Sequence, residues 1–225
     1  MLEQPGLSMI RKKSMDDSKH ILLMRHAEVD SKWRGKFLGA GDPALSEQGL
    51  DQARWWRHEL AAVSMDRIVS SSQKRALQTA QIVADGQSCP VEANPALREV
   101  NLGLWEGLSP SQVRRRYPKE YALRGHNLAE FPPPQGESLS DLARRVLPVW
   151  RELCQSGEKR LLLITHAGVL RVILCHTLGI DLNRALSWRL DHGSLSLLKC
   201  QQARFTLQAC NLLPHRTSQI SKYLE

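Results

Sequence analysis

Polar side chains suited to phosphate chemistry follow three short apolar runs of the sequence. The runs and the residues that follow them are His20–Met24 with Arg25 and His26, Asp66–Val69 with Arg75, and Arg160–Ile164 with Thr165 and His166. Runs of this length and apolarity are typical of strands that are covered on both faces. Functional sites of open α/β sheets form outside the carboxyl ends of the strands, so we expect these residues to converge on one crevice.

His26 is the candidate nucleophile, because Arg25 precedes it and Glu28 follows closely. Neutral imidazole is a competent nucleophile near neutral pH, since its unperturbed pKa is ~6.5. Neighbouring arginines would lower that pKa and keep a nitrogen lone pair available. Histidines are otherwise more often structural than catalytic, and we expect a structural role for His58, His126, His176, His192 and His215.

Arg25 and Arg75 are the candidates for binding the transferred phosphoryl group. A guanidinium is planar and permanently charged, and it matches two phosphate oxygens at once. Such a clamp offsets the negative charge on the equatorial oxygens during transfer. Arg75 also follows Ser70-Ser71-Ser72 at a predicted strand-to-helix turn, where backbone N–H groups favour an anion. Glu99 is the candidate acid that protonates the leaving alkoxide and then activates water.

Helical patterns and a hairpin supply the elements that position these residues. Helices are expected over Ser46 to about Ala62, Lys74–Ala84, Ser109 to about Leu123, Ser138 to about Leu153, and Gly168–Leu178. Ser109 and Ser138 begin capping boxes, and Pro148 predicts a kink or a break. Ser194–Lys199 and Phe205–Ala209 predict a hairpin. The pattern predicts an α/β fold in three layers, with a mostly parallel mixed sheet and helices on both faces.

The composition fits one domain without a membrane span. A chain of 225 residues can bury a full hydrophobic core, and no apolar run approaches the ~20 residues that cross a bilayer. The five cysteines are odd in number and include no C-x-x-C pair, which favours a cytoplasmic location over a disulfide framework. We expect a flexible N-terminal extension over residues 1–19 rather than a secretory signal, a single domain over 20–212, and a polar tail over 213–225.

The net charge of +8 leaves two interpretations open. Arg114–Arg116, together with Arg144 and Arg145, are candidates for a nucleic-acid patch. Such runs are more often the solvated faces of helices. A basic balance also suits an enzyme that attracts small anionic substrates.

Six segments in order resemble the histidine phosphatase superfamily, which includes the phosphoglycerate mutases. They are Leu23–Glu28, Gly35–Gly49, Ser70–Ala80, Leu97–Gly107, Gly136–Ser138 and Thr165–Val169. The first looks like the signature L-x-R-H-G-E, the third is similar to S-S-x-x-x-R-A-x-Q-T-A, and the fourth is similar to L-R-E-x-x-x-G-x-W-E-G. The resemblance spans about Ile21 to Leu198 and implies a phosphoglycerate mutase-like fold.

The resemblance also implies roles for individual residues. It implies that His26 is phosphorylated during turnover and that Glu99 is the acid and base. The residues that it implies for the phosphate pocket are Arg25, Arg75, His166 and Ala167. It implies neither a cofactor nor a metal ion.

Two positions depart from the family pattern. Ala27 stands where glycine is usual, and Lys32 stands where many members carry an asparagine that touches the phosphate. Either Lys32 or Lys36 is therefore a candidate for that contact. The segment between Glu99 and Gly136 is shorter than the insertion of cofactor-dependent mutases, which favours hydrolysis over isomerisation.

Within the superfamily the chain looks most like the alpha-ribazole phosphatases, which act in cobalamin assembly. The segments that carry this likeness are Gly103–Gly107, Gly136–Ser138 and Trp188–Gly193. The expected partner is a small phosphorylated metabolite, with no nucleic acid and no membrane, and the expected state is a monomer or a homodimer. Mutase-type phosphoryl transfer and a non-catalytic phosphate-binding module remain the alternatives.

Overall fold

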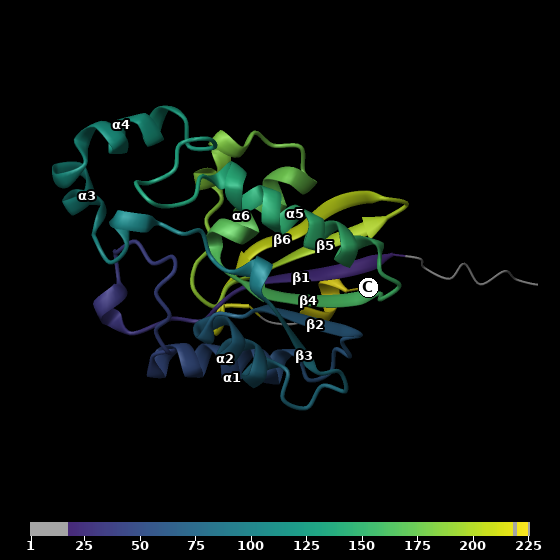
Figure 1. The fold of residues 1–225 in the computed structure, drawn as a ribbon. Helices are drawn as coiled ribbons and strands as arrows, with labels where there is room; N and C mark the ends of the chain where they lie inside the picture. Colours follow the sequence, from purple (N-terminus) through teal and green to yellow (C-terminus); the bar gives the residue numbers. More distant parts are fainter. Residues whose placement is uncertain (1–17, 218–219, 225) are drawn as a thin grey trace, which may run out of the picture.

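The apolar runs form one sheet whose parallel strands all end on the same side. The computed structural model describes residues 18–217 and 220–224. Its strands are β1 (Lys19–Arg25), β2 (Arg67–Ser71), β3 (Val91–Asn94), β4 (Arg160–Thr165), β5 (Leu195–Gln201) and β6 (Arg204–Leu212). Their order is β3-β2-β4-β1-β5-β6 (Figure 1). The first four strands of this order are parallel, β5 is antiparallel to β1, and β6 is antiparallel to β5. The predicted mixed sheet is thus confirmed.

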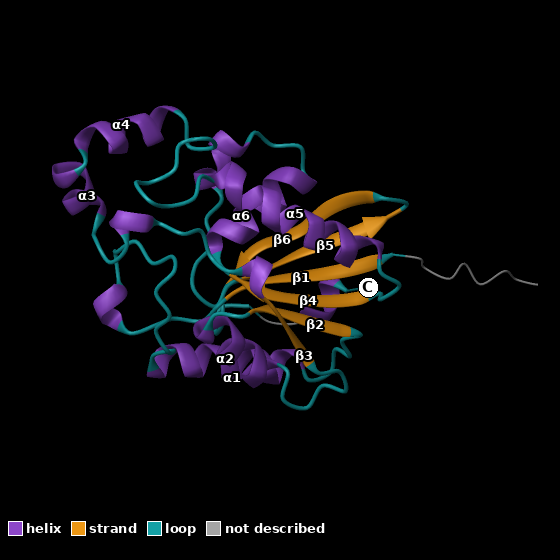
Figure 2. Ribbon diagram, in the orientation of Figure 1, coloured by secondary structure: helices purple, strands orange, loops and turns teal. Residues whose placement is uncertain are grey.

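Helices cover both faces of the sheet, as predicted (Figure 2). The helices are α1 (Glu47–Leu60) and α2 (Lys74–Val83) on one face, and α5 (Leu139–Gln155) and α6 (Ala167–Thr177) on the other. Side chains of β1 alternate between the two cores, because successive Cβ atoms of a strand point to opposite faces. Leu22 and Met24 pack with α1 and α2, whereas Ile21 and Leu23 pack with α5 and α6.

Three elements differ from the sequence expectations. The predicted helix from Ser109 to Leu123 is two helices, α3 (Pro110–Arg116) and α4 (Pro118–His126). They break at Tyr117 because a residue before proline disfavours the helical conformation. Pro148 lies inside α5, which runs on without the predicted break. β3 was not predicted, because its sequence Val-Glu-Ala-Asn lacks a continuous apolar run; in the structure this strand is half-exposed.

The two ends of the chain differ in how far the structure describes them. The predicted N-terminal extension lies outside the described residues, apart from Ser18 and Lys19, which is already in β1. In the segment predicted as a polar tail, Ile220 is buried in the core that contains α1 and α2. Among the described residues, no helix is long and apolar enough to cross a membrane.

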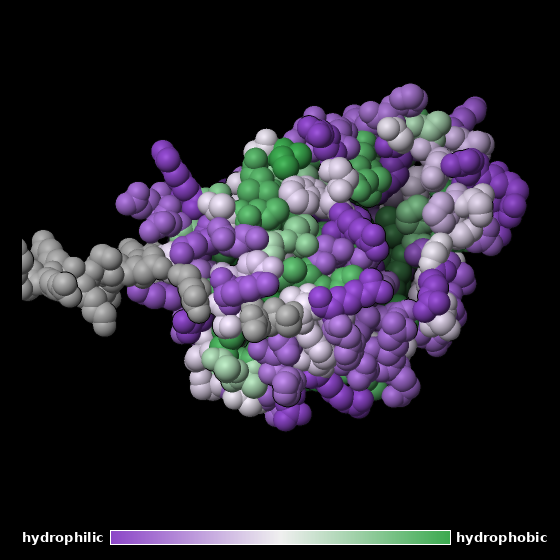
Figure 3. Space-filling view, turned by 180° about the vertical axis from the view of Figure 1, so that it is seen from behind, coloured by the Kyte–Doolittle hydropathy of each residue, from purple (hydrophilic) through white to green (hydrophobic). Residues whose placement is uncertain are grey.

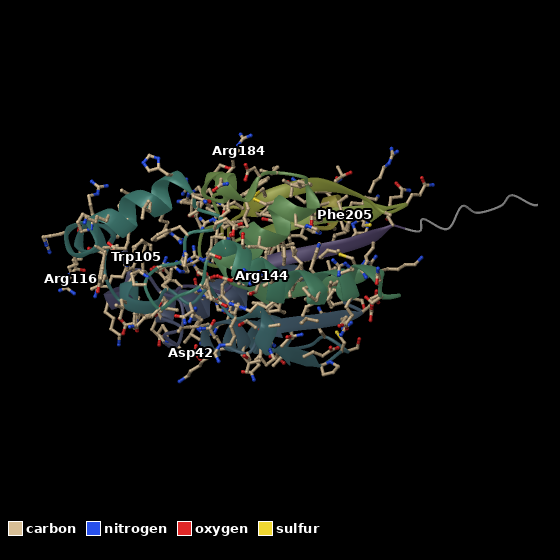
Figure 4. The ribbon with its side chains drawn as sticks, turned by 45° about the horizontal axis from the view of Figure 1, so that its top comes forward. Asp42, Trp105, Arg116, Arg144, Arg184 and Phe205 are labelled. Atoms are coloured by element: carbon tan, nitrogen blue, oxygen red, sulfur yellow. The ribbon has the colours of Figure 1, made fainter. Side chains whose placement is uncertain are left out.

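The face seen in Figure 3 carries many hydrophilic residues among smaller apolar areas, with a recess on the side where the parallel strands end. α3 and α4 project from the body on that side (Figure 1). The candidate nucleic-acid patch is divided between two elements: Arg116 lies at the end of α3, whereas Arg144 lies on α5 (Figure 4). Arg114–Arg116 and Arg144 are exposed, whereas Arg145 is half-buried.

Candidate active site

The carboxyl ends of β1, β2 and β4 bring the predicted site residues together. The backbone N–H of His26 donates to the carbonyl of Thr165 across 2.8 Å, which joins the ends of β1 and β4. The ring centroids of His26 and His166 are 5.2 Å apart. Nε of Arg75, which lies in the first turn of α2, is 3.2 Å from Nε2 of His26.

Hydrogen bonds fix which nitrogen of His26 is free. Nδ1 lies 2.8 Å from the carbonyl oxygen of Ala27, and a carbonyl can only accept, so Nδ1 carries the proton. Nε2 therefore holds the lone pair, toward which Arg75 donates. Burial lowers the pKa of His26 well below its usual value, and His166, Arg75 and Arg25 lower it further. The imidazole is neutral near pH 7 with Nε2 unprotonated, which is the state that nucleophilic attack requires.

Arg75 is fully buried and held by the loop before α1. Its Nη atoms donate to the carbonyls of Gly39, at 3.0 Å, and Gly41, and one lies 3.7 Å from Asp42. A Cβ on Gly39 would stand 2.2 Å from the carbonyl oxygen of Val100, so only glycine fits there. The loop glycines thus orient Arg75 with Nε toward His26.

Arg25 is held by the loop before β5. Its Nη1 donates to the carbonyl of Leu190 and its Nη2 to Nε2 of His192, both across 2.6 Å. His192, for which the sequence predicts a structural role, lines the cavity 5.2 Å from His26. The signal for it lies in the topology: β5 is antiparallel to β1, so the residues before β5 reach the end of β1.

His166 is fully buried beside His26 and is not among the residues that line the cavity. Its Nε2 lies 2.8 Å from Oγ of Ser71, at the end of β2. Burial, and then Arg75 and Arg25, lower the pKa of His166 well below its usual value. Within the described part of the chain, Nδ1 of His166 and Nε of Arg25 are buried without a hydrogen-bond partner. The N–H at Nε of Arg25 is a buried donor that requires a partner, and a bound oxyanion would supply one. Nδ1 of His166 is a second such donor in the tautomer in which the hydroxyl of Ser71 donates to Nε2.

Glu99 faces the same cavity from the loop after β3. Both carboxylate oxygens accept from the N–H of Gly168 at 3.1 Å, at the start of α6. A Cβ on Gly168 would lie 2.3 Å from Oε1 of Glu99, so this close approach depends on glycine. The backbone N–H of Glu99 donates to Oε1 of Gln73 across 2.7 Å, which ties the loop to the start of α2.

Arg145 holds the Glu99 loop from α5. Its guanidinium donates to the carbonyls of Ala96, Arg98 and Glu99 at 2.7–3.0 Å. It also makes two bonds of 3.0 Å to the carboxylate of Glu137. The sequence interpretation of this arginine as part of a solvated face was wrong, because it is half-buried against the loop.

The cavity above His26 has a volume of about 240 Å³. Its outer wall comes from the loop after β1 and includes Trp33, Arg34, Lys36 and Leu38. Of the two candidate lysines, Lys36 lines the cavity, whereas Lys32 is exposed and pairs with Asp30 at 3.5 Å. A larger hollow of about 700 Å³, beside Asp66 and Arg160 at the opposite ends of the strands, contains none of the site residues.

The remaining predicted residues are placed as follows. Ala167 is the first residue of α6 and is buried beside His166. His58, His126, His176 and His215 do not line the cavity. Over residues 18–217 and 220–224, no group of three or more His, Cys, Asp or Glu side chains is arranged to hold a metal ion.

Comparison with known proteins agrees with this geometry. Residues 21–213 match the family model of the histidine phosphatase superfamily, branch 1. Phosphoserine phosphatase 1 of Hydrogenobacter thermophilus is 29% identical over 198 residues, which cover 87% of this chain and 93% of that protein. The mouse enzyme 6-phosphofructo-2-kinase/fructose-2,6-bisphosphatase 1 is 32% identical over 71% of this chain and 33% of its own length.

Solved structures share the whole fold. The alpha-ribazole phosphatase of Shigella flexneri superposes with a TM-score of 0.80 at 25% identity, covering 89% of this chain and 98% of that chain. A mycobacterial glucosyl-3-phosphoglycerate phosphatase gives a TM-score of 0.77 at 25% identity, covering 86% of this chain and 99% of that one. This chain belongs to the histidine phosphatase superfamily, branch 1, and is a hydrolase of phosphate monoesters.

Proposed function

We propose that this chain hydrolyses a small phosphorylated metabolite through a phosphohistidine formed on His26. The observation that carries the proposal is the fixed tautomer of this residue: Nδ1 donates to the carbonyl of Ala27, and the unprotonated Nε2 accepts from Arg75 at 3.2 Å. A nucleophile with a fixed free lone pair next to a buried cation suits attack on a phosphate dianion.

The reaction proceeds in two displacements. In the first, Nε2 of His26 bonds to phosphorus, the bond from phosphorus to the ester oxygen breaks, and Glu99 donates a proton to that oxygen. In the second, water attacks the phosphohistidine, Glu99 takes a proton from the water, and inorganic phosphate leaves with His26 restored. Arg25 and Arg75 offset the charge of the transferred group, and the neutral imidazole of His166 contributes a hydrogen bond. The unpartnered Nε of Arg25 and Nδ1 of His166 supply the donors.

The cavity supports a small substrate. A volume of about 240 Å³ accommodates a phosphate and a leaving group of modest size. Alpha-ribazole 5′-phosphate, in a cytoplasmic cobalamin pathway, is the substrate that the sequence resemblance favours. Phosphoserine and glucosyl-3-phosphoglycerate are further candidates, because related proteins carry those names. Mutase-type transfer is less favoured because α3 and α4 form only a short insertion between Glu99 and Gly136.

The test is phosphate release from a panel of monoesters in the presence of a chelator. The panel contains alpha-ribazole 5′-phosphate, phosphoserine, 3-phosphoglycerate and p-nitrophenyl phosphate. We expect turnover without added metal and a loss of about 10³-fold or more in His26→Ala with the fold retained. Glu99→Gln should slow alkyl esters far more than p-nitrophenyl phosphate, whose leaving group needs no proton. Turnover that survives in His26→Ala would contradict the mechanism, and mutase activity alone would favour the alternative.

A further inference from the structure

His192 is joined to the phosphate-binding end of β1 by its side chain and its backbone. Its Nε2 lies 2.6 Å from Nη2 of Arg25. The next residue, Gly193, donates its N–H to the carbonyl of His26 at 3.0 Å, and the carbonyl of Ser194 accepts from the N–H of Arg25 at 3.0 Å. The indole N–H of Trp56 also donates to the carbonyl of Gly193 across 2.6 Å. The position of the imidazole relative to Arg25 is therefore fixed from both sides.

The direction of the hydrogen bond to Arg25 defines the state of His192. A guanidinium only donates, so Nε2 of His192 accepts and the proton is on Nδ1. Burial lowers the pKa of His192 to about 3, with further lowering by Arg25 and Arg75. His192 is thus a neutral acceptor at any pH where the protein is expected to function.

A neutral acceptor has a specific consequence for Arg25. Two of its three guanidinium nitrogens are committed to Leu190 and His192, and Nε is buried without a partner in the described part of the chain. The plane of the guanidinium is thus fixed while three of its five N–H groups, that of Nε among them, are not used by these two bonds and remain for a ligand. A carboxylate in place of the imidazole would fix the plane equally well, but it would cancel the charge that attracts a phosphate.

We propose that His192 is a positioning residue for phosphoryl transfer, which orients Arg25 toward the phosphoryl group and leaves the arginine's positive charge to the substrate. The effects expected on turnover rest on the proposed function. The effect on binding does not, because the orientation of Arg25 by an uncharged acceptor also sets the affinity of the site for inorganic phosphate.

The test compares three replacements of His192. Gln retains a neutral acceptor at a similar reach, Phe retains a ring without an acceptor, and Glu retains an acceptor that carries a negative charge. We expect kcat/KM to fall about 10- to 100-fold in His192→Phe, the usual cost of losing a hydrogen bond to a charged group. His192→Gln should stay within about threefold of the unmodified enzyme, and His192→Glu should lose activity although it keeps the bond. His58→Phe, on the exposed face of α1, is the control.

A double-mutant cycle separates positioning from a merely structural role. In an Arg25→Ala background, His192→Phe should change kcat/KM by less than about twofold, because there is no guanidinium left to orient. Equal losses of kcat/KM in His192→Gln and His192→Phe would overturn the proposal. It would also be overturned if His192→Phe lowered kcat/KM as much in the Arg25→Ala background as in the unmodified enzyme.

Calorimetric titration with inorganic phosphate distinguishes this proposal from the proposed function. The unmodified protein and His192→Gln should bind phosphate with similar affinity, and His192→Phe and His192→Glu should bind it at least about 10-fold more weakly. If no ester is hydrolysed but this order of affinities holds, the proposed function fails and the positioning role stands. If all variants bind phosphate equally, the positioning role is wrong whatever the turnover.

Discussion

Single imidazole nitrogens decide the chemistry that this site can perform. The sequence was sufficient to name His26, Arg25, Arg75, His166 and Glu99, because each follows a recognisable strand or motif, and the structure brings them together. It could not say which nitrogen of His26 is free, since that depends on the carbonyl of Ala27 turning back toward the ring. It could not place His192 beside Arg25 either, because that position depends on β5 pairing with β1, which a predicted hairpin does not specify.

Lys36 and Lys32 provide a matched pair for testing the cavity wall. Lys36 lines the cavity, whereas Lys32 lies outside it and pairs with Asp30 at 3.5 Å. Removing the ammonium of Lys36 should weaken attraction of the anionic substrate, and we expect KM to rise about 3- to 10-fold in Lys36→Ala with kcat little changed. Steady-state kinetics at two salt concentrations measure this. An equal rise of KM in Lys32→Ala, or a fall of kcat without a change of KM in Lys36→Ala, would show that Lys36 does not attract the substrate.

Among the elements, the loop from β3 to α3 is held by contacts that are distant in sequence. Its carbonyls at Ala96, Arg98 and Glu99 are bound by Arg145 of α5, and Glu137 completes the contact. Neither β3 nor this clamp could be predicted from the sequence. β3 is a half-exposed edge strand without an apolar run. Arg145 cannot be distinguished from its exposed neighbour Arg144 by sequence, because only the fold shows that the loop packs against Arg145.

Arg145 and Arg144 are adjacent in sequence and make a matched test of loop positioning. Arg144 is exposed and pairs only with Asp141, at 2.7 Å, among its described contacts. In Arg145→Ala the loop carrying Glu99 loses its hydrogen bonds, so kcat for an alkyl phosphate should fall about 10-fold or more, and less for p-nitrophenyl phosphate. Arg144→Ala should leave both rates unchanged. Equal losses on both esters in Arg145→Ala would point to a general loss of folding rather than to a displaced acid.

At the scale of the whole molecule, the fold buries three neutral imidazoles at one edge of the sheet. His26 and His166 converge because the parallel strands β1 and β4 end side by side, whereas His192 comes from the loop before the antiparallel strand β5. The apolar runs are why the sequence predicted the sheet and both helical layers. The pKa values of His26, His166 and His192 all lie below 6.5, primarily through burial. The unfolded chain therefore binds more protons than the folded chain once the pH falls below about 6.5.

This difference predicts that acid destabilises the protein. The contribution is fully present above the unfolded pKa and is lost as the pH falls, at up to about 1.4 kcal/mol per pH unit for each imidazole. Chemical denaturation at pH 7.0, 6.0 and 5.0 should show a falling free energy of unfolding, and His192→Gln should reduce the slope by removing one titrating group. A free energy of unfolding that is constant or rises toward pH 5 would contradict the burial of neutral imidazoles.

The central claim is that Nε2 of His26 carries the phosphoryl group during turnover. Rapid quenching into base during hydrolysis, followed by peptide mass spectrometry and ³¹P NMR, tests it directly, because phosphohistidine is stable in base and its two isomers are distinguishable. The account predicts one phosphoryl group on the peptide that contains His26, bonded to Nε2, and none in His26→Ala. A phosphoryl group on Nδ1 or on another residue, or turnover that persists without the His26 imidazole, would contradict it.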